Sequence, residues 1–495
     1  MTGKTTGDTI SRPTMLLVAG RAVGFVAAFA IPVVLARIFD RAEYGTYKQL
    51  FLVFATLYGL AQLGMAESLY YFVPSRSKEA AGRHVANALV TLGAAGVGCL
   101  ALLYAMRTTV AAWLTNSQLA DHLALVGVLL ALMLVTALFE IVMIARKQHF
   151  AAAVTYAGSD VTRTLLFVLP ALGFGGVRGL LVGGVTFGVL RLAAMLAYLW
   201  REFGRELRVD LDIWRRQLAY ALPFAMAVSV EVVLLNFHQY FVAARFDTAT
   251  FAIYSVGCLQ IPLIDLVMTS SVNVMMVQMA GHAAKGETRA AMALWHDTIC
   301  KLAFIFFPLT VLLLVTAQQV IVALFTANYL ASVPIFMIWT LTILPSAFAV
   351  DGVLRVYAQT RFLLVMNLVR LVVVVALISW LLTAFGLRGA VLVTLLAMSI
   401  VKGMGVVRAA QLFNAPFAEA LPWRRLGAIA GRSLVSAVPA YLILHTLTLP
   451  ALAELACAGA AYGATYLALS YGSLSAEQLD VPWSFAMRRR VTQES

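Results

Sequence analysis

Stretches of about twenty consecutive apolar residues recur along nearly the whole chain, from Thr14 to Tyr471. Apolar residues make up 62% of the 495 residues, and charged residues only 12%. A soluble protein of this length could not bury so much apolar surface, whereas a bilayer solvates it and requires roughly 20 apolar residues for each helical crossing. The sequence therefore predicts an all-α polytopic membrane protein.

Polar breaks divide these stretches into about fourteen predicted transmembrane helices. The first six span residues 14–38, 44–73, 83–106, 119–145, 150–172 and 176–200. The next six span residues 217–243, 250–277, 297–324, 331–357, 362–385 and 388–413. The last two span residues 425–446 and 450–472.

Lysine and arginine are distributed unequally over the two sides of the predicted membrane. Of the 36 basic residues, 24 fall in the terminal tails and even-numbered loops, seven in odd-numbered loops, and five within predicted helices. Short loops rich in lysine and arginine stay in the cytoplasm, so both termini are expected there. The net charge of +13 is scattered over short loops beside the membrane, which favours anionic lipid over nucleic acid as a partner.

The two halves of the chain share short motifs at an offset near 210 residues. The segment 36–47 recurs with one gap as 244–254, and segment 175–179 resembles 386–389. An even number of helices per repeat gives two copies with the same orientation in the membrane. We expect two pseudo-symmetric six-helix lobes around a central cavity, followed by two extra C-terminal helices.

These divisions give five predicted regions. They are a cytoplasmic tail (1–13), an N-terminal lobe (14–210), a C-terminal lobe (211–420), a two-helix appendage (421–472) and a cytoplasmic C-terminal tail (473–495).

Motifs of catalysis are missing from the sequence. It has no phosphate-binding loop of the Walker type, no HExxH zinc motif and no Ser/His/Asp arrangement. The four cysteines lie in apolar stretches without the spacing of a metal site or a disulfide. The predicted outer loops are too short for the acceptor site of a glycan polymerase. A transporter without a cofactor or metal is therefore favoured over an enzyme.

Charged residues within the predicted helices are the candidates for a functional site. A charge at the membrane centre costs at least about 2.5–3.5 kcal/mol and usually faces the bundle interior. Cationic side chains there suit a pyrophosphate group, and the candidates are Arg21, Arg163, Arg191, Arg370 and Lys402. Arg191 and Lys402 follow the repeat-matched Arg178 and Arg388 at nearly equal spacing, so they should occupy nearly equivalent places.

Acidic residues share the predicted helices with these cations. The candidates for ion coupling or gating are Glu67, Asp160, Glu231, Asp265 and Asp351, and Glu140 is a further contact near a helix end. Glu231 and Asp265 lie near mid-membrane, which favours coupling to an ion or proton. Asp160 and Arg163 are three residues apart on one helix and could equally neutralise each other.

Five short motifs, in order along most of the chain, carry a family resemblance. They are Gly20-Arg21 with Gly24, residues 35–47, residues 64–74, residues 173–179 and residues 324–331. The chain resembles the oligosaccharide flippases of bacterial polysaccharide biosynthesis, a Wzx-like family of the multidrug/oligosaccharidyl-lipid/polysaccharide exporter superfamily. That superfamily also contains multidrug extruders and the peptidoglycan-precursor flippase.

The resemblance implies a substrate and a location. The substrate would be an undecaprenyl-pyrophosphate-linked oligosaccharide, moved from the inner to the outer leaflet of the bacterial cytoplasmic membrane by alternating access, for exopolysaccharide, capsule or O-antigen synthesis. Membrane lipids and polysaccharide polymerase or export proteins are the other expected partners. Two alternatives stay open: a cation-coupled drug exporter of the same superfamily, and a membrane enzyme of glycan polymerisation.

Overall fold

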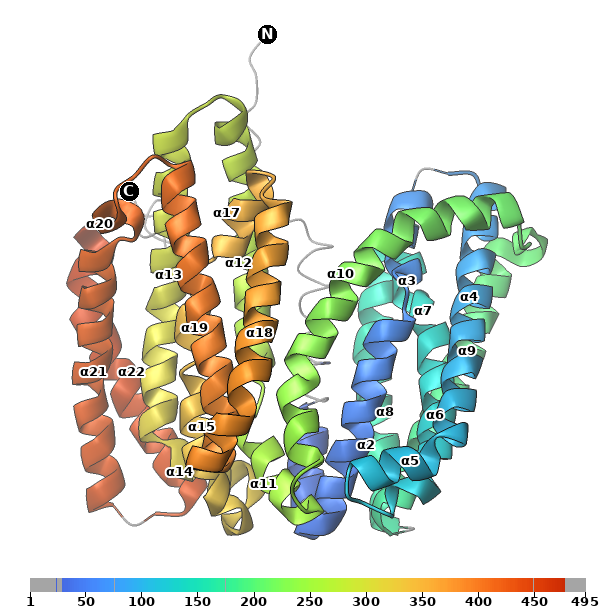
Figure 1. The fold of residues 1–495 in the computed structure, drawn as a ribbon, viewed down its shortest axis with the longest axis horizontal. Coiled ribbons are helices and arrows are strands. Elements are labelled where there is room, and N and C mark those ends of the chain that lie inside the picture. The colour runs from blue at the N-terminus through green and yellow to red at the C-terminus, as the bar shows by residue number, and fades with distance from the viewer. Residues whose placement is uncertain (1–23, 25–28, 75, 174, 448, 477–495) are drawn as a thin grey trace, which may run out of the picture. The chain divides into compact units, whose positions relative to one another are not determined.

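The computed structural model describes residue 24 and residues 29–74, 76–173, 175–447 and 449–476 (Figure 1). These described residues form α-helices, two short 3-10 segments and connecting turns, with no strand among them. Their contacts divide the chain into two compact units, with the boundary between Ser255 and Val256. Unit 1 denotes the residues before this boundary, and unit 2 those after it.

Unit 1 consists of helices joined by short connections. After an apolar helix at Phe29–Ile38, its elements are α2 (Arg41–Ala61), α3 (Met65–Phe72), α4 (Lys78–Ala105), α5 (Arg107–Trp113), α6 (Leu119–Thr136), α7 (Leu138–Ala145), α8 (His149–Gly173), α9 (Gly176–Phe203), η1 (Gly204–Glu206) and α10 (Leu211–Ala243). The next helix, α11 (Thr248–Gly257), crosses the boundary between the units.

Unit 2 is built in the same way. Its elements are α12 (Pro262–Ala284), α13 (Thr288–Val315), α14 (Ala317–Phe325), η2 (Ala327–Ser332), α15 (Val333–Thr340), α16 (Ile343–Ser346), α17 (Val350–Val356), α18 (Thr360–Phe385), α19 (Leu387–Leu412), α20 (Phe417–Ala420), α21 (Trp423–Thr446) and α22 (Ala451–Ala476).

The prediction of an all-α polytopic chain is confirmed, whereas the number of spans differs. Among the described residues, eleven helices are long and apolar enough to cross a membrane, or twelve if α2 and α3, which meet at a 40° bend, form one span. Two of the fourteen predicted spans do not reach this standard. Asp160 and Arg163 keep the mean hydropathy of α8 below that of the eleven helices, and the helix at Phe29–Ile38 is short. The rest of the first predicted span lies outside the described residues.

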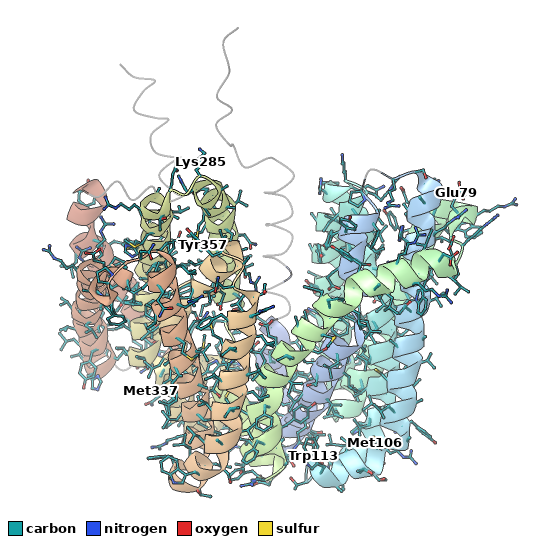
Figure 2. All side chains as sticks on the ribbon, turned by 45° about the horizontal axis from the view of Figure 1, so that its top comes forward. Glu79, Met106, Trp113, Lys285, Met337 and Tyr357 are labelled. Carbon is teal, nitrogen blue, oxygen red and sulfur yellow. The ribbon has the colours of Figure 1, made fainter. Side chains whose placement is uncertain are left out.

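Large apolar side chains lie exposed on the outside of the helices, as in a protein surrounded by lipid. Met106 and Trp113, at one end of unit 1 (Figure 2), are among them, with Trp113 56% exposed. Water would disfavour so much contiguous apolar surface, and in a soluble protein patches of this kind are limited to a few hundred square ångströms. The surface therefore agrees with the composition.

The repeat predicted from sequence is visible in the backbone. Between α4 and α5 the helix breaks at Met106 (φ −97°, ψ 10°), and between α13 and α14 it breaks at Thr316 (φ −99°, ψ 15°), 210 residues later. At the start of α2 the Asp40 carboxylate accepts a hydrogen bond from the Glu43 amide, and at the start of α11 Asp247 accepts one from Thr250. Equivalent caps begin equivalent helices.

A second repeated element ends α7 and α17. Lys147 (φ +61°) and Ala358 (φ +53°) both adopt the left-handed conformation after the helix. The residue that follows donates its backbone N–H back across the turn. Gln148 donates to the carbonyl of Met143 and Gln359 to that of Leu354, each over 2.8 Å. This is the hydrogen-bond pattern of a Schellman motif, which satisfies carbonyls that the helix end leaves free.

Glycines permit close contact within the helical hairpins α8–α9 and α18–α19. A Cβ atom on Gly179 would overlap the carbonyl oxygen of Pro170, and one on the repeat-related Gly389 would overlap that of Leu381. Small residues at these points let two backbones approach more closely than side chains would allow. The conspicuous glycines of the sequence motifs therefore fix how each hairpin closes.

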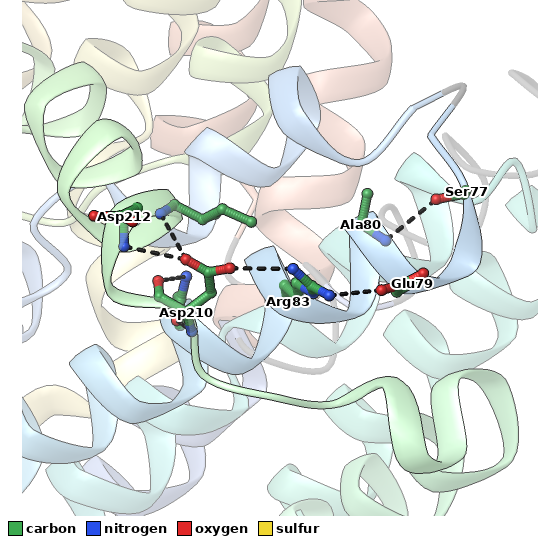
Figure 3. A network of polar contacts seen from close by, with 8 residues as sticks. Ser77, Glu79, Ala80, Arg83, Asp210 and Asp212 are labelled. Carbon is green, nitrogen blue, oxygen red and sulfur yellow. Dashed lines mark hydrogen bonds and ion pairs between the residues drawn. The ribbon is translucent and has the colours of Figure 1, made fainter.

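The N-terminal end of α10 is fixed to α4 by a polar network (Figure 3). Asp210 caps α10 by accepting a hydrogen bond from the Ile213 amide at 3.1 Å, and its other carboxylate oxygen pairs with Arg83 at 3.2 Å. The side-chain amide of Asn87 accepts a hydrogen bond from the backbone N–H of Asp210 at 3.1 Å and donates one to its carbonyl at 3.0 Å. The Ile213 amide, aided by Arg83, holds the pKa of Asp210 below its usual value.

A buried polar network continues this attachment along α10. The Gln217 amide donates to the Ser68 hydroxyl of α3 at 2.9 Å, while its oxygen lies 3.1 Å from Nδ1 of His84 on α4. All three side chains are buried, and a buried network in which the members satisfy one another is rigid. Thus α10, the first helix of the predicted second lobe, packs within unit 1.

The glycine contacts predict a position-specific effect on stability. Gly389→Ala should lower the stability of the detergent-solubilised protein by about 1–3 kcal/mol, because the added methyl group meets the backbone of α18. Gly403→Ala on the same helix is the control, since a Cβ there meets nothing within 4 Å and alanine has the better helix propensity. Thermal unfolding followed by size-exclusion chromatography measures both, and an equal melting temperature for the two variants would contradict the packing described.

Candidate functional site

A buried ion pair joins α7 and α9 in unit 1. One guanidinium nitrogen of Arg191 lies 2.6 Å from Oε2 of Glu140, and the side chains are only 11% and 4% exposed. The other terminal nitrogen donates to the hydroxyl of Ser159 on α8 at 2.6 Å. The guanidinium also lies 5.8 Å from the ring centre of Phe139. Three helices thus converge on one cation within the membrane.

Unit 2 contains an ion pair at the same positions of the repeat. Lys402 on α19 pairs with Asp351 on α17, with side chains 10% and 35% exposed. Lys402 follows Arg191 by 211 residues, and Asp351 follows Glu140 by the same 211 residues. Each repeat therefore pairs one cation on its sixth predicted helix, at α9 or α19, with one carboxylate on its fourth, at α7 or α17.

The equivalence of the two carboxylates was not predicted, although its signal is present in the sequence. Spacing relates Arg191 to Lys402, whereas Glu140 and Asp351 were expected only as separate charges near helix ends. Applying the same offset to every charge within the predicted helices would have paired them. The ion pairing itself could not be derived from spacing, because it depends on how the fourth and sixth helices of each repeat pack.

Arg370 occupies the repeat position of Ser159. Each is the eleventh residue of its helix, α18 and α8 respectively, and they are 211 residues apart. Arg370 is half-buried. Where unit 1 presents a hydroxyl to its cation, unit 2 therefore carries a second cation at the corresponding place in the repeat.

Asp160 and Arg163 form an ion pair on α8, at 2.7 Å. This is the mutual neutralisation that their spacing allows. The pair is partly exposed, and Nε of Arg163 is buried without a hydrogen-bond partner among the described residues. A Cβ atom at Gly24 would overlap the Asp160 carboxylate, so the absence of a side chain at Gly24 gives this carboxylate its space.

Tyr58 on α2 lies near several of the charged side chains of unit 1. It is within electrostatic range of Arg191, Arg163, Glu67 and Glu140. Glu67, in the first turn of α3, is half-buried, and its Oε2 makes no hydrogen bond among the described residues. Four of the charged residues singled out from the sequence therefore lie near one helix, two of them basic and two acidic.

The remaining candidates lie elsewhere. Glu231 on α10 and Asp265 in the first turn of α12 are exposed, and neither forms an ion pair within the described part of the chain. Arg21 lies outside the described residues. All four cysteines are free, and among the described residues no group of three or more His, Cys, Asp or Glu side chains is placed to hold a metal ion.

A helical bundle of membrane-spanning length, with charged pairs buried at its helix junctions, is the architecture of a polytopic transporter. The model of a family described as "Polysaccharide biosynthesis protein" matches residues 34–334, more than half of the chain. The chain therefore belongs to this family. A comparison with curated proteins finds no match.

Solved transporter structures share the fold. The lipid II flippase MurJ in an inward closed conformation is similar over 93% of this chain and 99% of its own, with 13% identity and a TM-score of 0.73. An inward-facing multidrug resistance transporter of the MATE family is similar over 82% and 96%, with 14% identity and a TM-score of 0.59. A transporter of the same MOP superfamily from Pyrococcus furiosus is similar over 81% and 94%, with 12% identity and a TM-score of 0.54.

These likenesses establish the fold, and together with the family they confirm the predicted superfamily. The expectation of a transporter rather than a glycan-polymerising enzyme agrees with this family and this fold.

The buried pair in unit 1 makes a testable difference between single and double variants. Arg191→Gln should destabilise the protein by about 3–5 kcal/mol, because it leaves Glu140 buried and uncompensated. In the double variant Glu140→Gln/Arg191→Gln no buried charge is left alone, so most of this stability should return. Thermal unfolding of the wild type, both single variants and the double variant gives the coupling, and strictly additive effects would show that the two side chains do not interact.

Proposed function

We propose that this protein is a flippase for a polyprenyl-pyrophosphate-linked oligosaccharide. It moves the lipid from the inner to the outer leaflet of the bacterial cytoplasmic membrane by alternating access, with both termini in the cytoplasm. The basic residues of the even-numbered loops support this orientation. Polysaccharide polymerase or export proteins would receive the glycan on the outer side.

The repeated ion pair is the observation that carries the proposal. Replacing a buried ion pair by apolar residues of similar size is often neutral or stabilising, so stability alone is a weak reason to hold one. Here a cation is held at the same place in both repeats, Arg191 in unit 1 and Lys402 in unit 2. Cations held in a membrane protein at such a cost suit an anionic group that must cross the membrane.

Exchange of carboxylate for phosphate gives a physical route to binding. A pyrophosphate would take the place of Glu140 and Asp351 on their cations, exchanging one anionic partner for another. Nε of Arg191 and Oε1 of Glu140 are both buried without hydrogen-bond partners among the described residues. The pair therefore has an unused hydrogen-bond donor on Arg191 and an unused acceptor on Glu140. Nε and the neighbouring terminal nitrogen of a guanidinium together suit two phosphate oxygens.

The other charged residues extend this site in our proposal. Arg163 and Arg370 lie on the helices that flank the two pairs, and Arg21 is a further cation of the predicted first helix. Glu67, Asp160 and Asp351 would gate the site, because Asp160 and Asp351 compete with the substrate for a cation and the half-buried carboxylate of Glu67 would repel it. The exposed Glu231 and Asp265 are the candidates for coupling to an ion.

The family and the fold support a lipid-linked glycan as the substrate. The family is described by polysaccharide biosynthesis, and a structure with the same fold is a flippase for lipid II. Transporters of multidrug resistance share the fold as well, so a drug exporter is the outcome to be excluded by experiment.

Deletion in the native cell separates these possibilities. We expect lipid-linked oligosaccharide to accumulate in the inner leaflet of the deletion strain, measured by the access of a membrane-impermeant glycan-modifying reagent to intact and opened cells. Normal delivery to the outer leaflet would contradict the flippase assignment. Increased sensitivity to cationic drugs without such accumulation would indicate the exporter instead.

Complementation of the deletion tests the cations. The variants Glu140→Gln/Arg191→Gln and Asp351→Asn/Lys402→Gln keep each pair neutral and should fold, yet each should lower delivery about tenfold or more, the size of a lost charge-assisted hydrogen bond. Arg178→Gln and Arg388→Gln are matched controls, since these arginines are also repeat-related but lie exposed at helix starts. Full delivery by both double variants at normal protein levels would remove the pairs from the site.

The membrane potential should accelerate transport. Moving one negative charge outward across a membrane with a negative interior is favourable by about 2.3 kcal/mol per 100 mV. In proteoliposomes, a potassium gradient with valinomycin should therefore increase the outward rate, and the logarithm of that rate should rise with the imposed potential. A rate independent of potential would show that the pyrophosphate crosses with its charge fully compensated.

A further inference from the structure

A pocket separate from the ion pairs lies within unit 1, where α2, α5 and α10 meet. Its volume is about 410 Å³, within the usual range for small-molecule sites. One wall is Trp113 at the end of α5, another is Thr56 on α2, and the rest is the last third of α10 with Arg245 beyond it. All of these residues belong to unit 1, so the pocket is complete within one compact body.

Aromatic rings form an open platform in this pocket. Trp113 and Tyr240 stack with centroids 5.5 Å apart and an interplanar angle of 23°. Phe237 and Phe241 stack with centroids 6.3 Å apart along α10. Because Trp113 is 56% exposed, the indole is reachable from outside while Tyr240 fixes it from behind.

Polar groups lie beside the platform. The side-chain amide of Asn236 lines the pocket and makes no hydrogen bond within the described part of the chain. The guanidinium of Arg245 lies 4.3 Å from the ring centre of Phe241, where the cation is held over the aromatic face. An amide has two donors and an acceptor to offer, and a guanidinium has only donors.

This combination suits a sugar ring. The C–H face of a pyranose is apolar and carries a slight positive potential, so it packs on the negative face of an aromatic ring. Its hydroxyl groups lie around the edge, where they both donate and accept hydrogen bonds. A lipid acyl chain would fill the aromatic part of the pocket but would leave the amide of Asn236 without a partner.

The pocket lies at the end of unit 1 away from the α4–α10 network. Trp113 and Glu79, which pairs with Arg83 in that network, are at opposite ends of the unit (Figure 2). In the orientation proposed above, the network is cytoplasmic and the pocket faces the outer side. A glycan that had crossed the membrane would meet it there.

We propose that this pocket is a sugar-binding subsite that holds a pyranose unit of the glycan on the outer side. The inference rests on the proposed flippase function, since it takes the sugar from the same substrate. Its chemistry is independent of the cations, because Trp113, Asn236 and Arg245 take no part in either ion pair.

Binding to the full-length protein in nanodiscs tests the subsite. The probes are lipid-linked oligosaccharide extracted from the native cell with radiolabelled sugars, and undecaprenyl pyrophosphate, which has no sugar. Trp113→Leu and Asn236→Leu should each weaken binding of the oligosaccharide lipid about three- to tenfold, the size of one aromatic or hydrogen-bond contact. Neither should change binding of undecaprenyl pyrophosphate.

Two controls isolate the ring face. Trp113→Phe keeps an aromatic platform and should stay within about twofold of the wild type. Tyr104→Leu removes an aromatic side chain of equal exposure (57%) that precedes α5 and does not line the pocket. It should leave both affinities unchanged.

The outcomes distinguish the two proposals. If the wild type binds both lipids and the leucine variants bind the oligosaccharide lipid as well as the wild type, the sugar subsite is wrong while the flippase assignment stands. Tighter binding of both lipids by the leucine variants would indicate an acyl chain in the pocket instead. If the wild type binds neither lipid, the proposed function fails and the sugar subsite fails with it. The same holds if variants that lack both ion pairs bind both lipids as tightly as the wild type does.

Discussion

A charge in the membrane interior requires a partner, and this requirement organises both units. Arg191 is held by Glu140 and Ser159, so α7, α8 and α9 must meet at one point. Lys402 and Asp351 impose the same condition on α17 and α19. Glycines allow these close approaches, between α8 and α9 at Gly179 in unit 1 and between α17 and α19 in unit 2, where a Cβ atom on Gly405 would overlap the side chain of Val350. The repeat is therefore a repetition of a charged junction as well as of a helix pattern.

Much of the fold followed from the sequence because the membrane leaves few choices. Lipid cannot hydrogen-bond to the backbone, so an apolar chain of this length must be helical, and the predicted spans from residue 44 onward coincide with helices or runs of short helices. The break at Met106 coincides with the end of the third predicted span, whereas the break at Thr316 falls inside the ninth and was not predicted, because no proline or glycine stands there.

The site was predicted less completely than the fold. Depth in the membrane selected charged residues, of which Arg191, Arg163, Glu67 and Glu140 lie within electrostatic range of Tyr58. Sequence distance within one helix sufficed for Asp160 with Arg163, because three residues bring two side chains to one face. It could not pair Glu140 with Arg191, which are 51 residues apart. Nor could it find the pocket, whose residues come from three helices and are ordinary aromatic residues when considered singly.

The two junctions differ in the nature of their cation. The guanidinium of Arg191 is a planar fork of donors that contacts from α7 and α8 hold in one orientation, whereas the ammonium of Lys402 is a compact charge with three rotatable donors on a flexible side chain. The first junction therefore suits an anion that lies in the plane of the fork, and the second suits one that approaches from several directions. The two repeats are thus related in position but differ in stiffness, so one half would fix the orientation of an anionic group while the other lets that group turn.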